Sequence, residues 1–145
     1  LMSVDSIHKE LYKIMWNYVG MARNEAGLKK ALEMLKAVRQ QFDTCVRVPG
    51  SKEGLNVELD KAIHLRDFIL MGELIAYDAL ERNESCGGHF REESQTEEGE
   101  AKRDDEHYMY VACWQYQGSD DVAPTLLKED LNYQYIKVQT RNYKS

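Results

Sequence analysis

The chain has few of the residues that covalent frameworks and rigid turns require. Its 145 residues include only two prolines and three cysteines, Cys45, Cys86 and Cys113. An odd number of cysteines without regular spacing does not predict a disulfide framework, and it favours a reducing compartment such as the cytosol.

Long apolar runs and clusters of basic residues are also missing. No apolar stretch approaches the roughly 18 residues that cross a bilayer, and the start of the chain does not resemble a signal peptide, so any membrane association is expected to be indirect. Acidic residues outnumber basic ones 25 to 19, for a formal net charge of -6. This balance argues against a nucleic-acid partner, because phosphate binding needs clustered Lys and Arg. Helix-like sequence directly after Leu1 predicts a fragment of a longer protein.

The usual cofactor motifs are absent as well. Gly87-Gly88 follows a predicted helix instead of a strand and lacks the third glycine of a dinucleotide-binding turn. Acidic pairs such as Glu92-Glu93 lie in a charge run without a cleft to separate their pKa values. We interpret this run as a solvated loop, with a docking surface for a basic partner as the alternative. No catalytic, cofactor-binding or metal residue is predicted in this chain.

Three segments instead carry apolar residues at spacings of three and four, which is typical of helices with one buried face. Polar residues suited to cap a helix start each segment: Ser3 or Asp5, Asn24 and Asn56. The expected helices cover residues 3–18, 24–46 and 56–83. The third has apolar residues on more than one face, as expected for the most buried helix.

The predicted fold class is therefore mainly α: an antiparallel three-helix bundle, spectrin-repeat-like, with a small C-terminal β appendage. The bundle is assigned to residues 1–91, an exposed and partly mobile charged loop to 92–107, and a β or irregular extension to 108–145. Aromatic and β-forming residues from Tyr108 predict a strand and turn. Beyond Pro124 we expect a return strand plus a second one, with a short helix at 128–134 as an option.

One arrangement has metal-ligand chemistry. Cys86 and His89, together with His107 and Cys113, offer two thiolates and two imidazoles, enough for a tetrahedral zinc site. The spacing is loose, and the alternative is that the cysteines are ordinary small residues and the histidines surface or hydrogen-bonded groups.

The order of short motifs resembles a known family. Residues 15–20 read M-W-N-Y-V-G and residues 23–28 read R-N-E-A-G-L, while residues 82–92 read R-N-E-S-C-G-G-H-F-R-E and residues 103–105 read R-D-D. This order is similar to the C-terminal domain of succinate dehydrogenase, fumarate reductase and L-aspartate oxidase flavoproteins. The tail beyond Tyr108 favours the dehydrogenase and reductase branch over L-aspartate oxidase.

Two features depart from the family pattern. Cys86 stands where the family usually has Arg, and the loop at 94–102 is longer than usual, which suggests a divergent bacterial subgroup. Other family members build this turn with Arg at the position of Cys86. Because they need no cysteine there, the zinc interpretation is weakened.

The resemblance implies an intact oxidoreductase that carries FAD in a separate domain and interconverts succinate and fumarate by hydride transfer. It also implies an iron–sulfur subunit, together with a membrane anchor subunit. A place in electron transport and the tricarboxylic acid cycle follows, peripheral to the cytoplasmic side of the inner membrane. The alternative function is an independent protein-interaction or zinc-binding helical domain. Separated from the flavin domain, the chain is expected to be inactive, to hold no cofactor and to self-associate through its uncovered apolar face.

Four residues are candidates for contact with the missing flavin domain: Glu84, Ser85, His89 and Arg91. Charged groups beside a Gly-Gly turn can be directed across an interface. Local capping of the third helix explains the same residue types equally well.

Overall fold

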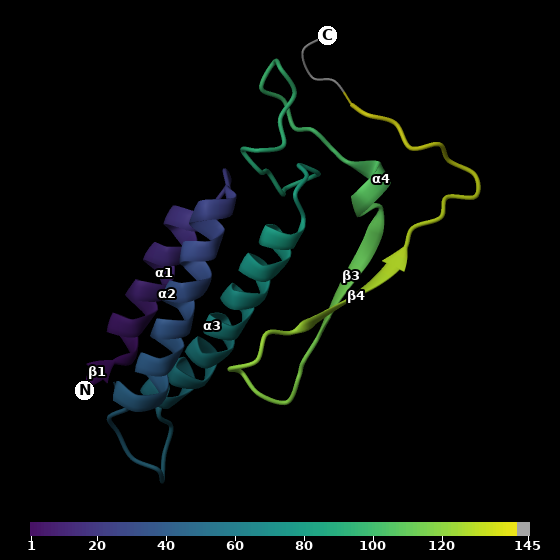
Figure 1. The fold of residues 1–145 in the computed structure, drawn as a ribbon. Coiled ribbons are helices and arrows are strands. Elements are labelled where there is room, and N and C mark those ends of the chain that lie inside the picture. Colours follow the sequence, from purple (N-terminus) through teal and green to yellow (C-terminus); the bar gives the residue numbers. More distant parts are fainter. Residues whose placement is uncertain (142–145) are drawn as a thin grey trace.

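The computed structural model describes residues 1–141 and is built around three long helices, α1 (Val4–Tyr18), α2 (Glu25–Cys45) and α3 (Val57–Glu81). The helices lie side by side, with the α1–α2 link at one end of the molecule and the α2–α3 link at the other (Figure 1). The mainly helical fold class is thus confirmed.

Side-chain caps explain where the helices begin. Ser3, Asn24 and Asn56 have extended backbones, and each side chain accepts a hydrogen bond from the backbone N–H three residues later. This satisfies one of the N–H groups that the first turn of a helix leaves without a partner. The predicted starts are correct within a residue, and Ser3 caps α1 while Asp5 lies in its first turn.

The core lies between the three helices. Its fully enclosed members come from one face of each helix, as the apolar spacing predicts for α1 and α2. The prediction that α3 is the most buried helix is wrong, because its other faces carry exposed apolar residues such as Val57, Ile63 and Met71. Gly72 of α3 faces Met15 of α1, where an added Cβ would lie 3.1 Å from the Met15 sulfur. The glycine therefore allows α1 and α3 to approach closely. The largest apolar side chains that are less than 2% exposed are Val4, Ile7, Leu28, Leu35, Leu65 and Ile69.

A short parallel pair was not predicted. Strand β1 (Met2–Ser3) pairs with β2 (Val46–Arg47), with Met2 opposite Val46. Two-residue strands have no alternation that a sequence pattern could reveal. The pair ties the residues before α1 to the end of α2.

The C-terminal part is a β-hairpin that follows a single helical turn. Helix α4 (Asp105–Tyr108), capped by Asp104, occupies the end of the predicted charged loop. Strand β3 (Tyr110–Gln115) then pairs antiparallel with β4 (Thr125–Asp130). The predicted strand, turn and return strand are correct.

Two finer predictions in this part are wrong. Residues 128–134 do not form a helix, because Lys128 to Asp130 belong to β4 and pair with β3. The described residues after β4, up to Arg141, also contain no further strand. Residues 142–145 of the predicted extension lie outside the described part.

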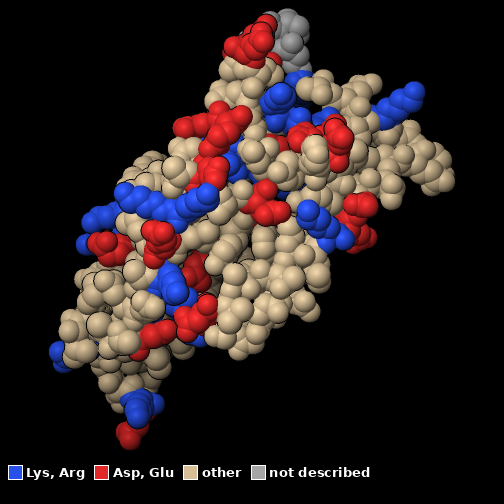
Figure 2. All heavy atoms as spheres, in the orientation of Figure 1, with Lys and Arg blue, Asp and Glu red and all other residues tan. Residues whose placement is uncertain are grey.

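The loop between α3 and α4 folds back on itself. Gln95 and Ala101 form an isolated bridge, and Ser94 is buried with its hydroxyl donating to Asn83. Acidic and basic side chains intermingle over this end and the helices, whereas a broad uncharged area covers the hairpin side (Figure 2). Among residues 1–141, no helix is both long and apolar enough to cross a membrane.

Candidate functional site

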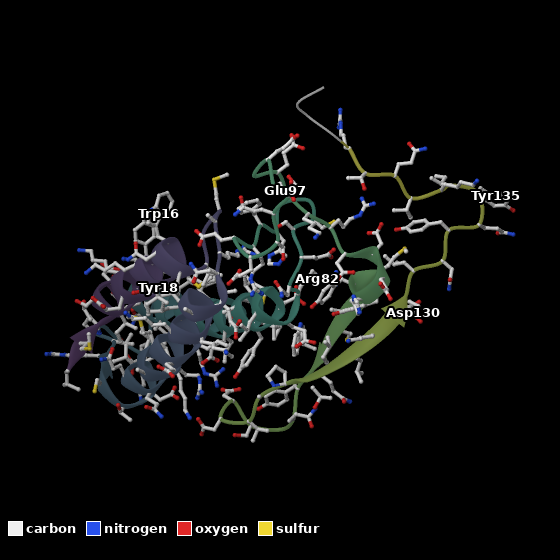
Figure 3. The ribbon with its side chains drawn as sticks, turned by 45° about the horizontal axis from the view of Figure 1, so that its top comes forward. Trp16, Tyr18, Arg82, Glu97, Asp130 and Tyr135 are labelled. Carbon is white, nitrogen blue, oxygen red and sulfur yellow. The ribbon has the colours of Figure 1, made fainter. Side chains whose placement is uncertain are left out.

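The residues beyond α3 form a polar network that joins all parts of the molecule. Arg82, the residue that ends α3, lies between that helix and the hairpin (Figure 3). Its guanidinium donates to the carbonyls of Tyr108 and Tyr110, at 2.8 and 3.2 Å, and lies over both tyrosine rings. A single side chain thus fixes the start of β3 against the end of α3.

Glu84 completes this contact from a buried position. It is 2% exposed, accepts from Arg82 at 2.9 Å, and its second oxygen accepts from the backbone N–H of Asp104 at 2.9 Å. Pairing both oxygens is what allows a carboxylate to be buried.

Ser85 organises the turn that follows. Its hydroxyl accepts from the N–H of Arg91 at 2.9 Å and donates to the carbonyl of Ser94 at 2.8 Å. The chain between them reverses at Gly87, whose φ of 59° is left-handed and suits glycine. Cys86 and His89 exchange backbone hydrogen bonds across this turn.

Arg91 is the largest enclosed side chain of the described molecule, with 2% exposure. Its Nη1 donates to the carbonyls of Ala79 and Leu80, both at 3.0 Å, in the last turn of α3. Carbonyls there have no helical partner and carry partial negative charge, so a guanidinium satisfies both requirements. Its Nε donates to Glu93 at 3.0 Å.

Glu93 connects this network to α2. Its other oxygen accepts from the N–H of Glu25, the first residue of α2, at 2.5 Å. Burial opposes ionisation of Glu93, but the hydrogen bonds from Glu25 and Arg91 lower its pKa overall. The carboxylate therefore lies charged at the positive end of a helix.

His89 links the network to the turn between α1 and α2. Nη1 of Arg23 lies 2.9 Å from His89 Nδ1, and His89 Nε2 lies 2.7 Å from the carbonyl of Arg82. A guanidinium can only donate, so Nδ1 accepts and Nε2 carries the proton. Burial, together with the charges of Arg23 and Arg91, lowers the pKa of His89. The imidazole is therefore neutral and uses both nitrogens.

Arg23 differs from Arg82 and Arg91, which each form an ion pair with a glutamate. Its Nε donates to the carbonyls of Val19 and Gly20, at 3.3 and 3.0 Å, which end α1. Within residues 1–141 it forms no ion pair closer than 4 Å, and burial lowers its pKa although the more distant Asp78 opposes this effect.

A second set of contacts holds the turn of the hairpin against the helices. Buried Arg39 of α2 donates to Glu73 at 3.3 Å and to Asp121 at 3.0 Å, and Arg66 of α3 donates to Asp120 at 3.0 Å. Midway along the hairpin, the indole N–H of Trp114 donates to Asp78 at 3.0 Å.

Two surface hollows lie along α3 beneath this hairpin. The volumes are about 520 Å³ at the polar network and about 440 Å³ toward the hairpin turn. The hollows share Met71, Leu74 and Trp114. The first also contains Arg23, Asp78, Arg82, His89 and Tyr110, and the second contains Arg66, Glu73, Tyr77, Tyr116 and Asp120.

The polar side chains of the network are engaged with partners inside the chain. Glu84, Ser85, His89 and Arg91 all direct their polar atoms at partners within the chain. His89 cannot act as a ligand or a base without losing one of its two hydrogen bonds. In the part of the chain that the structure describes, no three His, Cys, Asp or Glu side chains converge as metal ligands, and all three cysteines are free.

The structure brings together the four predicted contact residues, but it gives them different surroundings. Glu84, Ser85 and Arg91 are buried, whereas His89 is partly exposed and lines the larger hollow. Sequence reasoning missed Arg23 as a site residue. An arginine within the short link between two predicted helices was the available signal.

Three packed helices, closed at one end by a polar network and covered by a hairpin, define a helical structural domain. This chain belongs to the family described as the fumarate reductase flavoprotein C-terminal domain, whose model matches residues 8–143. The resemblance found in the motifs is confirmed, and the match favours it over an independent interaction or zinc-binding domain.

Individual relatives agree with this assignment. The chain is 36% identical over 92 residues to an uncharacterised FAD-dependent oxidoreductase of Methanocaldococcus jannaschii, covering 63% of this chain and 16% of the relative. It is 30% identical over 97 residues to a subunit of the CoM/CoB fumarate reductase of Methanothermobacter marburgensis, covering 67% and 17%. An L-aspartate oxidase of Acinetobacter baylyi is 31% identical over 81 residues, covering 56% and 14%.

Solved structures share the fold. Mycobacterium smegmatis Sdh1 in complex with UQ1 matches 90% of this chain with a TM-score of 0.76 and 27% identity, over 20% of its own chain. A quinol-fumarate reductase with menaquinol molecules matches 94% with a TM-score of 0.80, at 23% identity and over 22% of its chain. The chain thus spans less than a quarter of the length of these relatives.

Proposed function

We propose that this chain is the non-catalytic C-terminal domain of a succinate dehydrogenase or fumarate reductase flavoprotein subunit. The family match over residues 8–143 is the observation that carries the proposal. The intact subunit would interconvert succinate and fumarate by hydride transfer through FAD held in another part of the protein. The domain would contribute structure, because its polar groups are engaged in joining α3, the hairpin and the α1–α2 link.

The remaining features of the intact protein follow from the same proposal. Residues 1–91 form an antiparallel, spectrin-repeat-like bundle, 92–107 a charged loop and 108–145 an extension, together one domain of a larger flavoprotein. Its partners are an iron–sulfur subunit together with a membrane anchor subunit, which hold it at the cytoplasmic side of the inner membrane. There it takes part in electron transport and the tricarboxylic acid cycle.

Glu84, Ser85, His89 and Arg91 are proposed to support contact with the flavin-binding portion. His89 would touch that portion, since it lines an open hollow, while the three buried residues would hold the turn that presents it. His89→Gln in the intact subunit should then lower flavin occupancy or turnover. Unchanged flavin content and turnover would contradict this contact.

The function itself is tested on the natural gene product. Its sequence should contain a dinucleotide-binding glycine motif, and the purified subunit should show bound flavin and reduce an artificial electron acceptor with succinate. The separate chain should be colourless, free of zinc by metal analysis and without turnover, and it should self-associate in light scattering. A gene product without a flavin site, or turnover by the separate chain, would refute the proposal.

A further inference from the structure

One face of the molecule carries exposed apolar side chains from two helices. His8 of α1 lies 6.1 Å from Phe68 of α3, measured between ring centroids, and Tyr12 stacks on Trp16 along α1. Trp16 projects away from the helices (Figure 3) and is 71% exposed. We call this surface the α1–α3 face, and it consists of His8, Tyr12, Trp16, Phe68, Met71 and Ile75.

The contact between α1 and α3 is flanked by exposed apolar residues on both helices. Met15 lies against Gly72 between the two helices, and His8 of α1 meets Phe68 of α3 at the edge of this contact. Contiguous exposed apolar residues on two packed helices are typical of a surface that another body covers.

The face leads directly into the larger hollow. Met71 and Ile75 belong to both, and Arg23 and His89 also line the hollow. The Arg23 guanidinium donates through Nη1 to His89 and through Nε to the carbonyls that end α1. A partly desolvated guanidinium without an ion pair is complementary to a carboxylate brought by whatever covers the face.

We propose that the α1–α3 face docks on the flavin-binding portion of the same protein, which places a carboxylate against Arg23. This inference rests on the proposed function and specifies the surface and the charge of its partner. The matched stretch makes up 16% and 17% of two relatives, one of them an FAD-dependent oxidoreductase, so a polypeptide of similar length would supply a covering body. His89 is the positioning residue that orients Arg23.

The first test measures coverage of the face in the intact subunit by hydroxyl-radical footprinting. Trp16 and Met71 are 71% and 58% exposed in this chain, whereas residues at the core of an interface are fully buried. Their oxidation relative to the urea-unfolded subunit should therefore be suppressed well beyond the roughly twofold that their partial burial in this chain allows. Suppression below about twofold in a flavin-loaded subunit would refute the docking face and leave the proposed function intact. A subunit that binds no flavin would refute the proposed function instead.

The second test compares two matched substitutions in α3. Met71→Asp and Ile63→Asp introduce the same charge in the same helix, at positions that are 58% and 57% exposed. Only Met71 lies in the proposed face. Met71→Asp should accelerate proteolysis at the junction with the flavin-binding portion, because the cleavage rate follows the population of the undocked form. Equal acceleration by both variants would contradict the proposal.

The charge is tested in the same assay. Arg23→Gln should accelerate cleavage roughly 30-fold or more, the loss expected for one partner of a desolvated interfacial ion pair. Arg47→Gln removes the same charge from an exposed position in β2 and should change the rate less than about threefold. Increasing salt should accelerate cleavage of the unsubstituted protein more than that of Arg23→Gln. Equal effects of the two Gln variants would refute the carboxylate.

Discussion

Replacing Arg91 should destabilise the chain more than replacing any exposed arginine. The Arg91 guanidinium donates to the carbonyls of Ala79 and Leu80 at the end of α3, and the side chain is 2% exposed. Arg91→Met keeps most of the aliphatic volume and removes both hydrogen bonds. The substitution therefore isolates the polar contribution.

The expected loss follows from those contacts. Leaving a buried carbonyl without a partner costs about 1–3 kcal/mol, so two carbonyls cost about 2–6 kcal/mol. The charge at the end of the α3 dipole adds about 0.3–1 kcal/mol. The ion pair with Glu93 adds little, because Glu93 is at the surface and such pairs contribute about 0–1 kcal/mol. A total of about 5 kcal/mol is expected, within a range of about 2–8 kcal/mol.

Urea unfolding followed by far-ultraviolet circular dichroism measures this loss in the free energy of unfolding. Arg103→Met is the matched control, since Arg103 is more exposed and pairs mainly with the neighbouring Asp105. It should cost no more than about 1 kcal/mol. A loss below about 1 kcal/mol for Arg91→Met would show that water or relaxation satisfies the α3 carbonyls, and would refute the reasoning.

Three further predictions concern other parts of the chain. Because the pKa of His89 lies below its ordinary 6.5, the folded state binds fewer protons, so stability should fall as the pH drops below about 6.5. His89→Gln should flatten that decline in urea titrations from about pH 7.5 to about pH 5.5. Gly72→Leu should push α1 from α3 and cost about 1–3 kcal/mol in thermal unfolding, whereas Gly54→Ala, with open space around it, should have little effect. Asp121→Asn should change global stability by less than about 1 kcal/mol, yet accelerate amide exchange in the hairpin, because it weakens the contact with Arg39; unchanged hairpin exchange would count against that attachment.

The helices could be predicted because their signals are local. Asn24 and Asn56 cap the residues that directly follow them, and the apolar spacing marks the buried side. The hairpin was partly predictable for the same reason, since a segment rich in aromatic residues, from Tyr108 to Tyr116, precedes a turn signal. The irregular course after β4 was not, because Tyr133, Tyr135 and Ile136 resemble a strand whether or not a partner strand is present.

The site depends on contacts between residues far apart in the sequence. The motif at residues 82–92 located the network, but periodicity could not show that Arg91 turns inward to α3 or that His89 meets Arg23, 66 positions earlier. Glu93 likewise belonged to a charge run interpreted as solvated. Its role at the start of α2 appears only when the chain returns to that helix.

The hairpin is attached to the helices chiefly through side chains, which has a consequence for motion. Arg82 holds its beginning, Trp114 its middle and Asp121 its turn. A two-stranded unit attached in this way can separate from α3 as one piece while the helical core stays folded. The hollows beneath it would then widen or narrow with the hairpin, since both lie between the hairpin and α3.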